Sequence, residues 1–302
     1  MTKHIYYIIA GHQLAIETPS PGDTAQLLPN FSPFRVAPST GNTFFPEQSS
    51  PLLLFKGNEK LEKPGGEPNE EIYIEGVMFS IYHREGSTWV AIERNGVEYT
   101  MLVSANKRNY KSNLLLTNPG EQFFTIAFLR IAFLLASAPY RTLKLHGSAI
   151  EKEGKALIFL GKSGTGKSTH SKQWLEYVPG CSLVNDDEPI VRIMDNDEVL
   201  VFGTPWSGST PCYRNVSAKT VALVHLEQHG ENILTKLSGA EVYAPLFQSA
   251  ALLQSDESHR QQVASTVLDI AERLPVYRLR NKPDREAVSL SESLLTVKNS
   301  RL

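Results

Sequence analysis

Cysteine is scarce in this chain, which has only Cys181 and Cys212 among its 302 residues. Two cysteines are too few for a disulfide framework or for a zinc site built from thiolates. No pair of histidines has metal-ligand spacing with a further ligand nearby, so we predict no zinc site. Free cysteine is among the residues most often buried, and we expect both to be reduced thiols in the core.

An excess of charge of one sign is also missing. The chain has 30 Lys and Arg against 32 Asp and Glu, a formal net charge of −2. This balance gives no whole-chain attraction to nucleic acid or to acidic membranes, so neither is an expected partner. Hydrophobic residues make up 41% of the chain and charged residues 21%. Both values are ordinary for a globular protein with a sizeable core.

Long apolar runs are absent as well. No stretch reaches the roughly 18 apolar residues that a membrane helix needs. The longest candidate, Phe123–Ala138, is interrupted by Arg130, and we interpret it as a buried helix. The apolar run near the N-terminus, Ile5–Ile9, has the length of a strand and is too short for a signal peptide. We therefore expect a cytoplasmic protein.

The first half reads as strands separated by polar loops. Three runs that alternate or stay apolar follow one another: Val77–His83, Thr88–Arg94 and Val97–Val103. The Asn95-Gly96 pair between the last two is the strongest short hairpin signal. A second hairpin is predicted around Gly11-His12. Residues 18–51 and 57–71 are predicted to be mostly loop. This half is therefore predicted to be an antiparallel sheet.

A domain boundary is predicted where the sequence changes from strand-like runs to an apolar helix. An apolar helix from Glu121 to about Ser137 follows Asn118-Pro119-Gly120, and Ala138-Pro139 ends it. Residues 1–140 are predicted to form a β-rich domain that ends in this bridging helix. Residues 141–302 alternate strand and helix and are predicted to form a second, mixed-sheet domain. The fold class is thus α+β or α/β, with the β-rich domain first.

The second half contains a motif of the form G-x-x-x-x-G-K-[ST]. Its residues are Gly161, Lys162, Ser163, Gly164, Thr165, Gly166, Lys167 and Ser168. Such a motif binds phosphate only where it follows a buried strand and opens a helix. The apolar run Lys155–Leu160 and the predicted helix Ser168–Tyr177 supply that context.

The residue types of this motif suit a nucleoside triphosphate. Glycines let backbone N–H groups turn inward, and a helix N-terminus adds partial positive charge. Lys167 is expected at the β- and γ-phosphates, the Ser168 hydroxyl on Mg²⁺, and Thr169 beside them. ATP and Mg²⁺ are therefore the predicted cofactors. The alternative is a glycine-rich turn with a surface lysine.

An acidic run lies where a metal partner is needed. Asn185-Asp186-Asp187-Glu188 follows the predicted strand Ser182–Val184. One Asp is predicted to bind Mg²⁺ and the other to accept the proton of an attacking hydroxyl. The alternative is a solvated turn before Pro189.

These segments together resemble a known family. The run His146-Gly147-Ser148, the loop 161–169 and Asn185-Asp186-Asp187 look like the catalytic domain of HPr kinase/phosphorylase. That domain is similar to the nucleotide-binding domain of phosphoenolpyruvate carboxykinase. The resemblance covers roughly residues 141–302. It implies a P-loop kinase fold and ATP-dependent transfer to a serine hydroxyl.

The resemblance also implies roles for single residues. Asp186 would be the general base, Asp187 would help Ser168 hold the metal, and His146 would lie beside the transferring phosphoryl group. Thr169 stands where the bifunctional enzyme usually has glutamate, and the glycine-rich signature that engages HPr is not evident. The chain thus looks like an outlying member acting on a peptide, a protein or a small molecule. Relatives assemble into rings, so a homo-oligomer is possible.

Two further groups of basic residues are candidates. Arg214, in the loop 203–215, is predicted to neutralise charge on the transferred phosphoryl group, with a surface salt bridge as the alternative. Lys219 has the same possible role. A patch of Tyr277, Arg278, Arg280 and Lys282 is either a contact for adenine or an acidic acceptor, or a solvated edge.

The sequence therefore predicts an ATP- and Mg²⁺-dependent kinase with a hydroxyl acceptor, and serine is the acceptor that we expect. Two rivals stay open. One is a non-enzymatic ATP-binding regulatory module, which has little use for a second carboxylate. The other is a carboxykinase-like enzyme acting on a small acid, which needs cationic residues to grip the substrate carboxylate.

Overall fold

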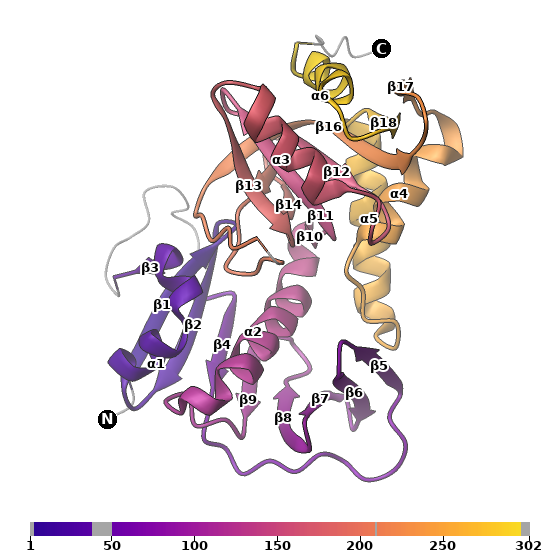
Figure 1. Ribbon diagram of the computed structural model, residues 1–302. Helices are drawn as coiled ribbons and strands as arrows, with labels where there is room; N and C mark the ends of the chain where they lie inside the picture. The colour runs from indigo at the N-terminus through magenta and orange to yellow at the C-terminus, as the bar shows by residue number, and fades with distance from the viewer. Residues whose placement is uncertain (1–2, 38–49, 209, 297–302) are drawn as a thin grey trace. The chain divides into compact units, whose positions relative to one another are not determined.

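A computed structural model describes residues 3–37, 50–208 and 210–296 (Figure 1). These residues form two compact units. The first contains residues up to Ser137 together with Leu253–His259, and the second contains Ala138–Leu252 and the residues from Arg260 onward. The segment Leu253–His259 lies far along the sequence from the rest of its unit, and no pattern in the sequence predicts that it belongs there.

The first unit is built on one sheet, with nine strands among the described residues. They are β1 (Lys3–Ile9), β2 (His12–Thr18), β3 (Arg35–Val36), β4 (Leu53–Lys56), β5 (Glu70–Ile74), β6 (Val77–Arg84), β7 (Ser87–Arg94), β8 (Val97–Val103) and β9 (Asn109–Ser112). Their order across the sheet is β3-β1-β2-β4-β9-β8-β7-β6-β5.

This sheet is mixed, which corrects the antiparallel sheet predicted from the sequence. β4 runs parallel to β2 on one side and to β9 on the other. Parallel neighbours need a crossover connection rather than a tight turn. The chain between β2 and β4 contains helix α1 (Pro21–Leu27) and the 3₁₀ helix η1 (Pro29–Phe34), both inside a stretch predicted as loop. Alternating hydrophobicity predicts strands but says little about their direction.

Tight two-residue turns join five of the antiparallel strand pairs. The turn residues are Ala10-Gly11, Glu75-Gly76, Glu85-Gly86 and Asn95-Gly96 here, and Glu153-Gly154 in the second unit. In each turn both residues have positive φ, with values from 50° to 81°. This is the type I′ geometry that matches the twist of the flanking strands. The hairpin predicted at Asn95-Gly96 is confirmed.

Helix α2 (Gln122–Ser137) packs against β4 and β8 within the first unit. It lies inside a helical segment, Pro119–Tyr140, that is long and apolar enough to cross a membrane by length and composition. The most apolar part of that segment is 72% buried inside the protein. Burial of this extent is what the interpretation of the run as a core helix predicts.

The second unit contains the other sheet. Its strands are β10 (Thr142–Lys144), β11 (Gly147–Lys152), β12 (Lys155–Leu160), β13 (Cys181–Asp187), β14 (Ile190–Ile193), β15 (Val199–Phe202), β16 (Ser217–Gln228), β17 (Ile233–Lys236) and β18 (Val276–Asn281). Seven follow the order β10-β14-β15-β16-β12-β11-β13, while β18 pairs with β16 and β17. β16 runs parallel to β12 and β18, and the other pairs are antiparallel.

Helices cover both faces of this sheet (Figure 1). On one face α3 (Lys167–Tyr177) and α6 (Arg285–Glu292) enclose a core around Phe159 and Trp174. On the other face α4 (Tyr243–Ser249) and the part of α5 (Glu257–Arg273) in this unit enclose a second core. β12 contributes side chains to both cores, which explains its continuous apolar sequence. Trp174 is fully buried in the first of these cores, whereas the next residue of α3, Leu175, is 47% exposed.

Candidate functional site

The glycine-rich loop connects buried β12 to the first turn of α3. Gly161, Gly164 and Gly166 have φ values of 145°, 81° and 98°, a region that other residues rarely adopt. A Cβ atom on Gly161 would lie 2.7 Å from Thr165 Oγ1 and 3.1 Å from the carbonyl oxygen of Leu226. The loop therefore requires glycine both for its backbone angles and for its close packing.

Lys167, the first residue of α3, folds back over this loop and is only 7% exposed. Its Nζ donates to the carbonyl oxygens of Gly161 at 2.9 Å and Lys162 at 3.2 Å, and to His146 Nε2 at 3.1 Å. Burial lowers the pKa of Lys167, while the nearby carboxylates of Asp187 and Asp186 act in the opposite direction.

His146 links Lys167 to Asp187. Its Nδ1 lies 3.1 Å from Asp187 Oδ1. A protonated lysine can only donate, so Nε2 of the histidine must accept, and the ring proton lies on Nδ1 facing the carboxylate. The hydrogen bond from His146 lowers the pKa of Asp187, against the opposing effect of burial. Lysine, histidine and aspartate thus form one hydrogen-bonded chain.

Asp186 contacts the other polar residue of the first helical turn. The Ser168 hydroxyl donates to Asp186 Oδ1 at 3.1 Å, and Asp186 is 4% exposed. This contact arises because β13 continues through both aspartates instead of ending at Val184 as predicted. Asp186 and Asp187 pair with Ser148 and Gly147 of β11, next to the end of β12. The sheet therefore carries the acidic pair to the loop.

These groups line a cavity of about 290 Å³. Its walls are His146, Gly147, Ser163, Gly164, Gly166, Lys167, Ser168, Thr169, Asp186 and Asp187. Of these, only Gly147 was not a predicted site residue. Gly161 and Lys162 line a neighbouring cavity of about 220 Å³, and Thr165 lines a third. The structure thus brings the loop, His146 and both aspartates together.

Arg214 is not among the residues that line these three cavities. Its guanidinium donates to the Ser182 hydroxyl at 3.0 Å and to the carbonyl oxygen of Leu183. Those residues lie near the start of β13, whereas the aspartates lie at its end. Lys219 forms a surface ion pair with Glu198 at 2.6 Å. The loop sequence suggested a cation for the site but did not determine where that cation points.

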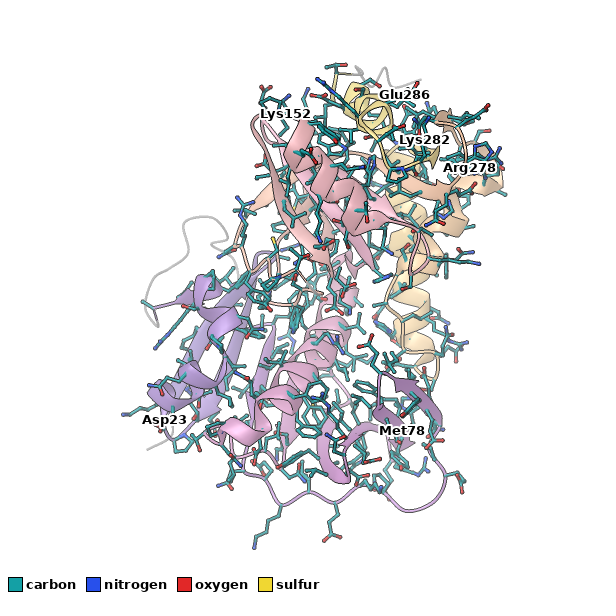
Figure 2. The ribbon with its side chains drawn as sticks, viewed as in Figure 1. Asp23, Met78, Lys152, Arg278, Lys282 and Glu286 are labelled. Atoms are coloured by element: carbon teal, nitrogen blue, oxygen red, sulfur yellow. The ribbon has the colours of Figure 1, made fainter. Side chains whose placement is uncertain are left out.

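The predicted basic patch is neutralised by neighbouring carboxylates. Arg278 and Arg280 both contact Glu227, at 3.1 Å and 3.3 Å, and Lys282 lies 3.5 Å from Asp284. Figure 2 shows Arg278 and Lys282 among the outward-facing side chains of the second unit. This geometry favours the solvated edge over a contact for an acidic acceptor.

Asn185 is a residue whose role the sequence did not reveal. Its amide nitrogen donates to Thr204 Oγ1 and to the carbonyl oxygen of Trp206, and its Oδ1 accepts from the backbone of Glu188. It is fully buried, and its hydrogen bonds connect the loop after β15 to the acidic end of β13. An amide among three acids was the available signal, because only an amide both donates and accepts.

The site offers a hydroxyl and two carboxylates to a cation. Within the described residues, no group of three or more His, Cys, Asp or Glu side chains is arranged to hold a metal. Mg²⁺ in phosphoryl-transfer sites takes one or two carboxylates and completes its shell with substrate phosphates and water. Ser168 with Asp186 fits that smaller requirement.

The chain was also compared with known proteins. No protein-family model matches it, and no curated protein does. Among solved structures it is similar to the HPr(Ser) kinase/phosphatase from Coxiella burnetii, with 11% identity. That match covers 50% of this chain and 87% of that chain, with a TM-score of 0.29. At this TM-score and identity the match assigns neither a fold nor a function to the chain.

Proposed function

We propose that this chain is an ATP- and Mg²⁺-dependent kinase that transfers the γ-phosphoryl group to a hydroxyl, with serine in a peptide, protein or small molecule as the acceptor. One observation carries the proposal. The Ser168 hydroxyl lies 3.1 Å from Asp186 Oδ1 at the wall of a cavity formed by the glycine-rich loop. A hydroxyl from the loop and a carboxylate from a neighbouring strand are the protein groups that hold Mg²⁺ in P-loop enzymes.

Lys167 is suited to the phosphates. Its ammonium group donates to two loop carbonyls and to His146, all of them neutral acceptors. Phosphate oxygens form stronger, charge-assisted bonds with an ammonium group, so a triphosphate in the cavity would draw Lys167 toward it. Bound Mg²⁺ would supply further positive charge to the phosphates.

The movement of Lys167 toward phosphate would also leave His146 available as a base. Once Lys167 turns to phosphate, His146 Nε2 loses its donor while Nδ1 stays bonded to Asp187. A neutral imidazole oriented by a carboxylate is the usual general base for a hydroxyl. The acceptor oxygen attacks the γ-phosphorus, the bond to ADP breaks, and the hydroxyl proton passes to His146. Asp186 would then hold the metal and Asp187 would orient the base. The family resemblance implies different roles, with Asp186 as the base and Asp187 as a metal ligand.

The experiment is a phosphoryl-transfer assay with the full chain, ATP, Mg²⁺ and a panel of serine-containing peptides and free serine. We expect transfer to at least one acceptor, and losses of about a hundredfold or more in Lys167→Ala and Asp186→Asn. Full activity in both variants would show that the residues are wrongly assigned. Tight ATP binding without transfer to any acceptor would instead support the regulatory module.

A further inference from the structure

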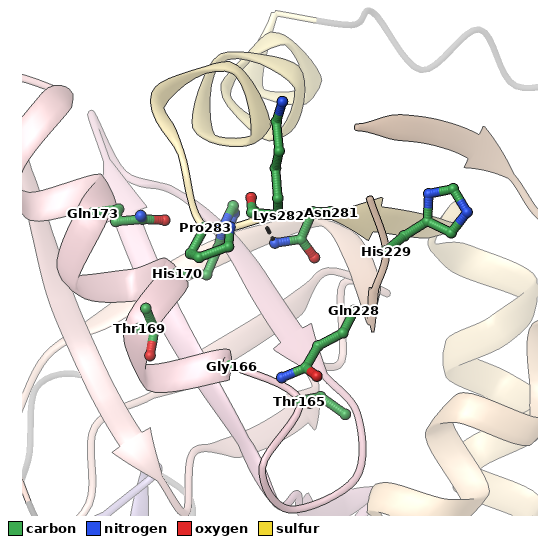
Figure 3. A pocket seen from close by; sticks show the side chains of 10 residues that line it. All are labelled: Thr165, Gly166, Thr169, His170, Gln173, Gln228, His229, Asn281, Lys282 and Pro283. Carbon is green, nitrogen blue, oxygen red and sulfur yellow. Dashed lines mark hydrogen bonds between the residues drawn. The ribbon is translucent and has the colours of Figure 1, made fainter. Parts of the chain in front are cut away.

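A second cavity, of about 360 Å³, adjoins the glycine-rich loop on the side of α3 (Figure 3). Its lining residues come from the glycine-rich loop, from α3, and from the ends of β16 and β18 with the residues that follow them: Thr165, Gly166, Thr169, His170, Gln173, Gln228, His229, Asn281, Lys282 and Pro283. Gly166 and Thr169 also line the cavity that contains the aspartates. The two cavities are therefore adjacent at the first turn of α3.

Two residues that line the second cavity carry buried hydrogen-bond acceptors that lack donors. Gln173 Oε1 and Asn281 Oδ1 are buried and have no hydrogen-bond partner. Asn281 is 8% exposed, and its amide nitrogen contacts the carbonyl oxygen of Lys282, which fixes the oxygen on the other side. Buried polar groups in native proteins are nearly always paired, so two unpaired acceptors at one cavity point to a ligand that donates.

Figure 3 shows how these side chains lie. The Gln173 amide extends from α3 toward the cavity, whereas Lys282 and His229 point away from it. Gln228 is already engaged, because its amide nitrogen donates to the carbonyl oxygen of Gly164 at 3.0 Å. Among the amide and basic side chains of this lining, the amides of Gln173 and Asn281 therefore remain for a ligand.

His170 adds a third unpaired atom at this cavity. Its Nε2 lies 3.1 Å from Ser291 Oγ, its Nδ1 has no partner, and the side chain is 1% exposed. The ring meets Phe159 edge-on at 4.6 Å between centroids. Burial lowers the pKa of His170 to about 4, so the ring is neutral at pH 7. A cavity of neutral acceptors suits an uncharged ligand rich in N–H groups better than another anion.

We propose that this cavity holds the purine base of the nucleotide, with the exocyclic amino group of adenine donating to the amide oxygens of Gln173 and Asn281. This inference rests on the proposed function, because the phosphates must occupy the adjoining cavity. An amino group has two N–H donors, which matches two orphaned acceptors. The position also fits, because the base of a nucleotide lies beyond the ribose from its phosphates. From the sequence, a contact between adenine and the basic patch was one alternative, and a solvated edge was the other.

The test compares three ligands, each with Mg²⁺, by equilibrium binding to the full chain. The ligands are ATP, purine riboside triphosphate, which lacks only the amino group, and inorganic tripolyphosphate. We expect ATP to bind about tenfold more tightly than purine riboside triphosphate, the usual value of one or two hydrogen bonds. Gln173→Met keeps the length of the side chain and removes the amide, so it should abolish this preference without changing tripolyphosphate binding.

Two further variants complete the design. Asn281→Ala acts on a different wall of the cavity and should also reduce the preference for ATP, which keeps the test decisive if one variant folds poorly. Lys172→Met changes an exposed neighbour on α3 and should retain the full preference.

Two outcomes overturn the inference in distinguishable ways. If tripolyphosphate and ATP bind but the preference for ATP is absent, or survives in both cavity variants, the base lies elsewhere and the proposed function stands. If neither ATP nor tripolyphosphate binds the unaltered chain, both the inference and the proposed function are wrong.

Discussion

The hydroxyl of Ser168 lies 3.1 Å from Oδ1 of Asp186, across a separation of 18 residues. Two pieces of secondary structure produce this contact. β12 ends where the loop begins. β13 pairs with β11, which also pairs with β12, so Asp186 near the end of β13 lies close to the end of β12. The distance is short enough for one divalent ion to be shared by both side chains after a small adjustment, because Mg²⁺ binds oxygen at about 2.1 Å.

Ser168→Ala tests this pair. The variant should lose the stabilisation that ATP with Mg²⁺ gives the protein, which is about 2.7 kcal/mol at a ligand concentration a hundred times Kd. Without ligand, its free energy of unfolding should change by about 1 kcal/mol, the value of one hydrogen bond. Thermal unfolding with and without ATP and Mg²⁺ measures both effects. Ser289→Ala, on the exposed side of α6, is the matched control. An unchanged ligand effect in Ser168→Ala would exclude this hydroxyl from the metal site.

Gly208→Ala tests the position of Asp187. A Cβ atom at residue 208 would lie 2.9 Å from the Cβ of Asp187, so the aspartate must shift. A displacement near 1 Å can reduce a catalytic rate about a hundredfold. We expect kcat to fall by about ten- to a hundredfold while ATP affinity stays within a few-fold. Gly230→Ala is the control, since nothing lies within 4 Å of its added methyl group. Equal kcat values for the two variants would remove Asp187 from the reaction.

Arg214→Met separates a structural from a catalytic arginine. The guanidinium binds Ser182 and Leu183 and is half-buried, so its loss should lower the free energy of unfolding by about 1–2 kcal/mol. The transfer rate should change less than about threefold, because the side chain is distant from the cavity residues along β13. An arginine that stabilises the transferred phosphoryl group contributes about a thousandfold or more. A rate loss of that size with unchanged stability would restore the sequence-based prediction.

The local part of the site could be predicted because each residue follows from its immediate neighbours. The apolar run Lys155–Leu160 indicates a strand buried on both faces, and the glycines and Lys167 follow it at fixed spacing. The strand β12 has the predicted bounds, and α3 begins one residue earlier than expected. Periodicity and motif spacing are properties of short segments, which is why they succeed here.

The rest depends on how distant segments meet. β4 runs parallel to its neighbours because of the path between β2 and β4, and the backbone of Arg214 lies close against Gly203. A Cβ on Gly203 would lie 2.0 Å from the carbonyl oxygen of Arg214. Gln173 and Asn281 are ordinary amides in the sequence. They become notable only when the fold buries both at one cavity without partners.

Two buried histidines should make the folded protein less stable at acid pH, whatever its function. Burial lowers the pKa of His170 and of His259 to about 4, and the two side chains are 1% and 0% exposed. An unfolded histidine binds its proton near pH 6.5, so between pH 6.5 and 4 the unfolded chain holds more protons than the folded one. Stability therefore falls as the pH decreases through that window, by about 2 kcal/mol per histidine between pH 6.5 and 5. The pKa of Asp187 is lowered as well, so its contribution is also lost as the pH falls, but only at lower pH, below its ordinary pKa of 3.8.

Urea unfolding at pH 7 and pH 5 measures the difference. His170→Gln cannot titrate, so its loss of stability between the two pH values should be smaller than that of the unaltered chain by about 2 kcal/mol. His229→Gln, at an exposed position, should keep the original pH dependence. If stability falls by the same amount between the two pH values in all three proteins, His170 takes up its proton as readily in the folded state as in the unfolded state. The cavity beside α3 would then be open to water and less suited to recognise a base through neutral acceptors.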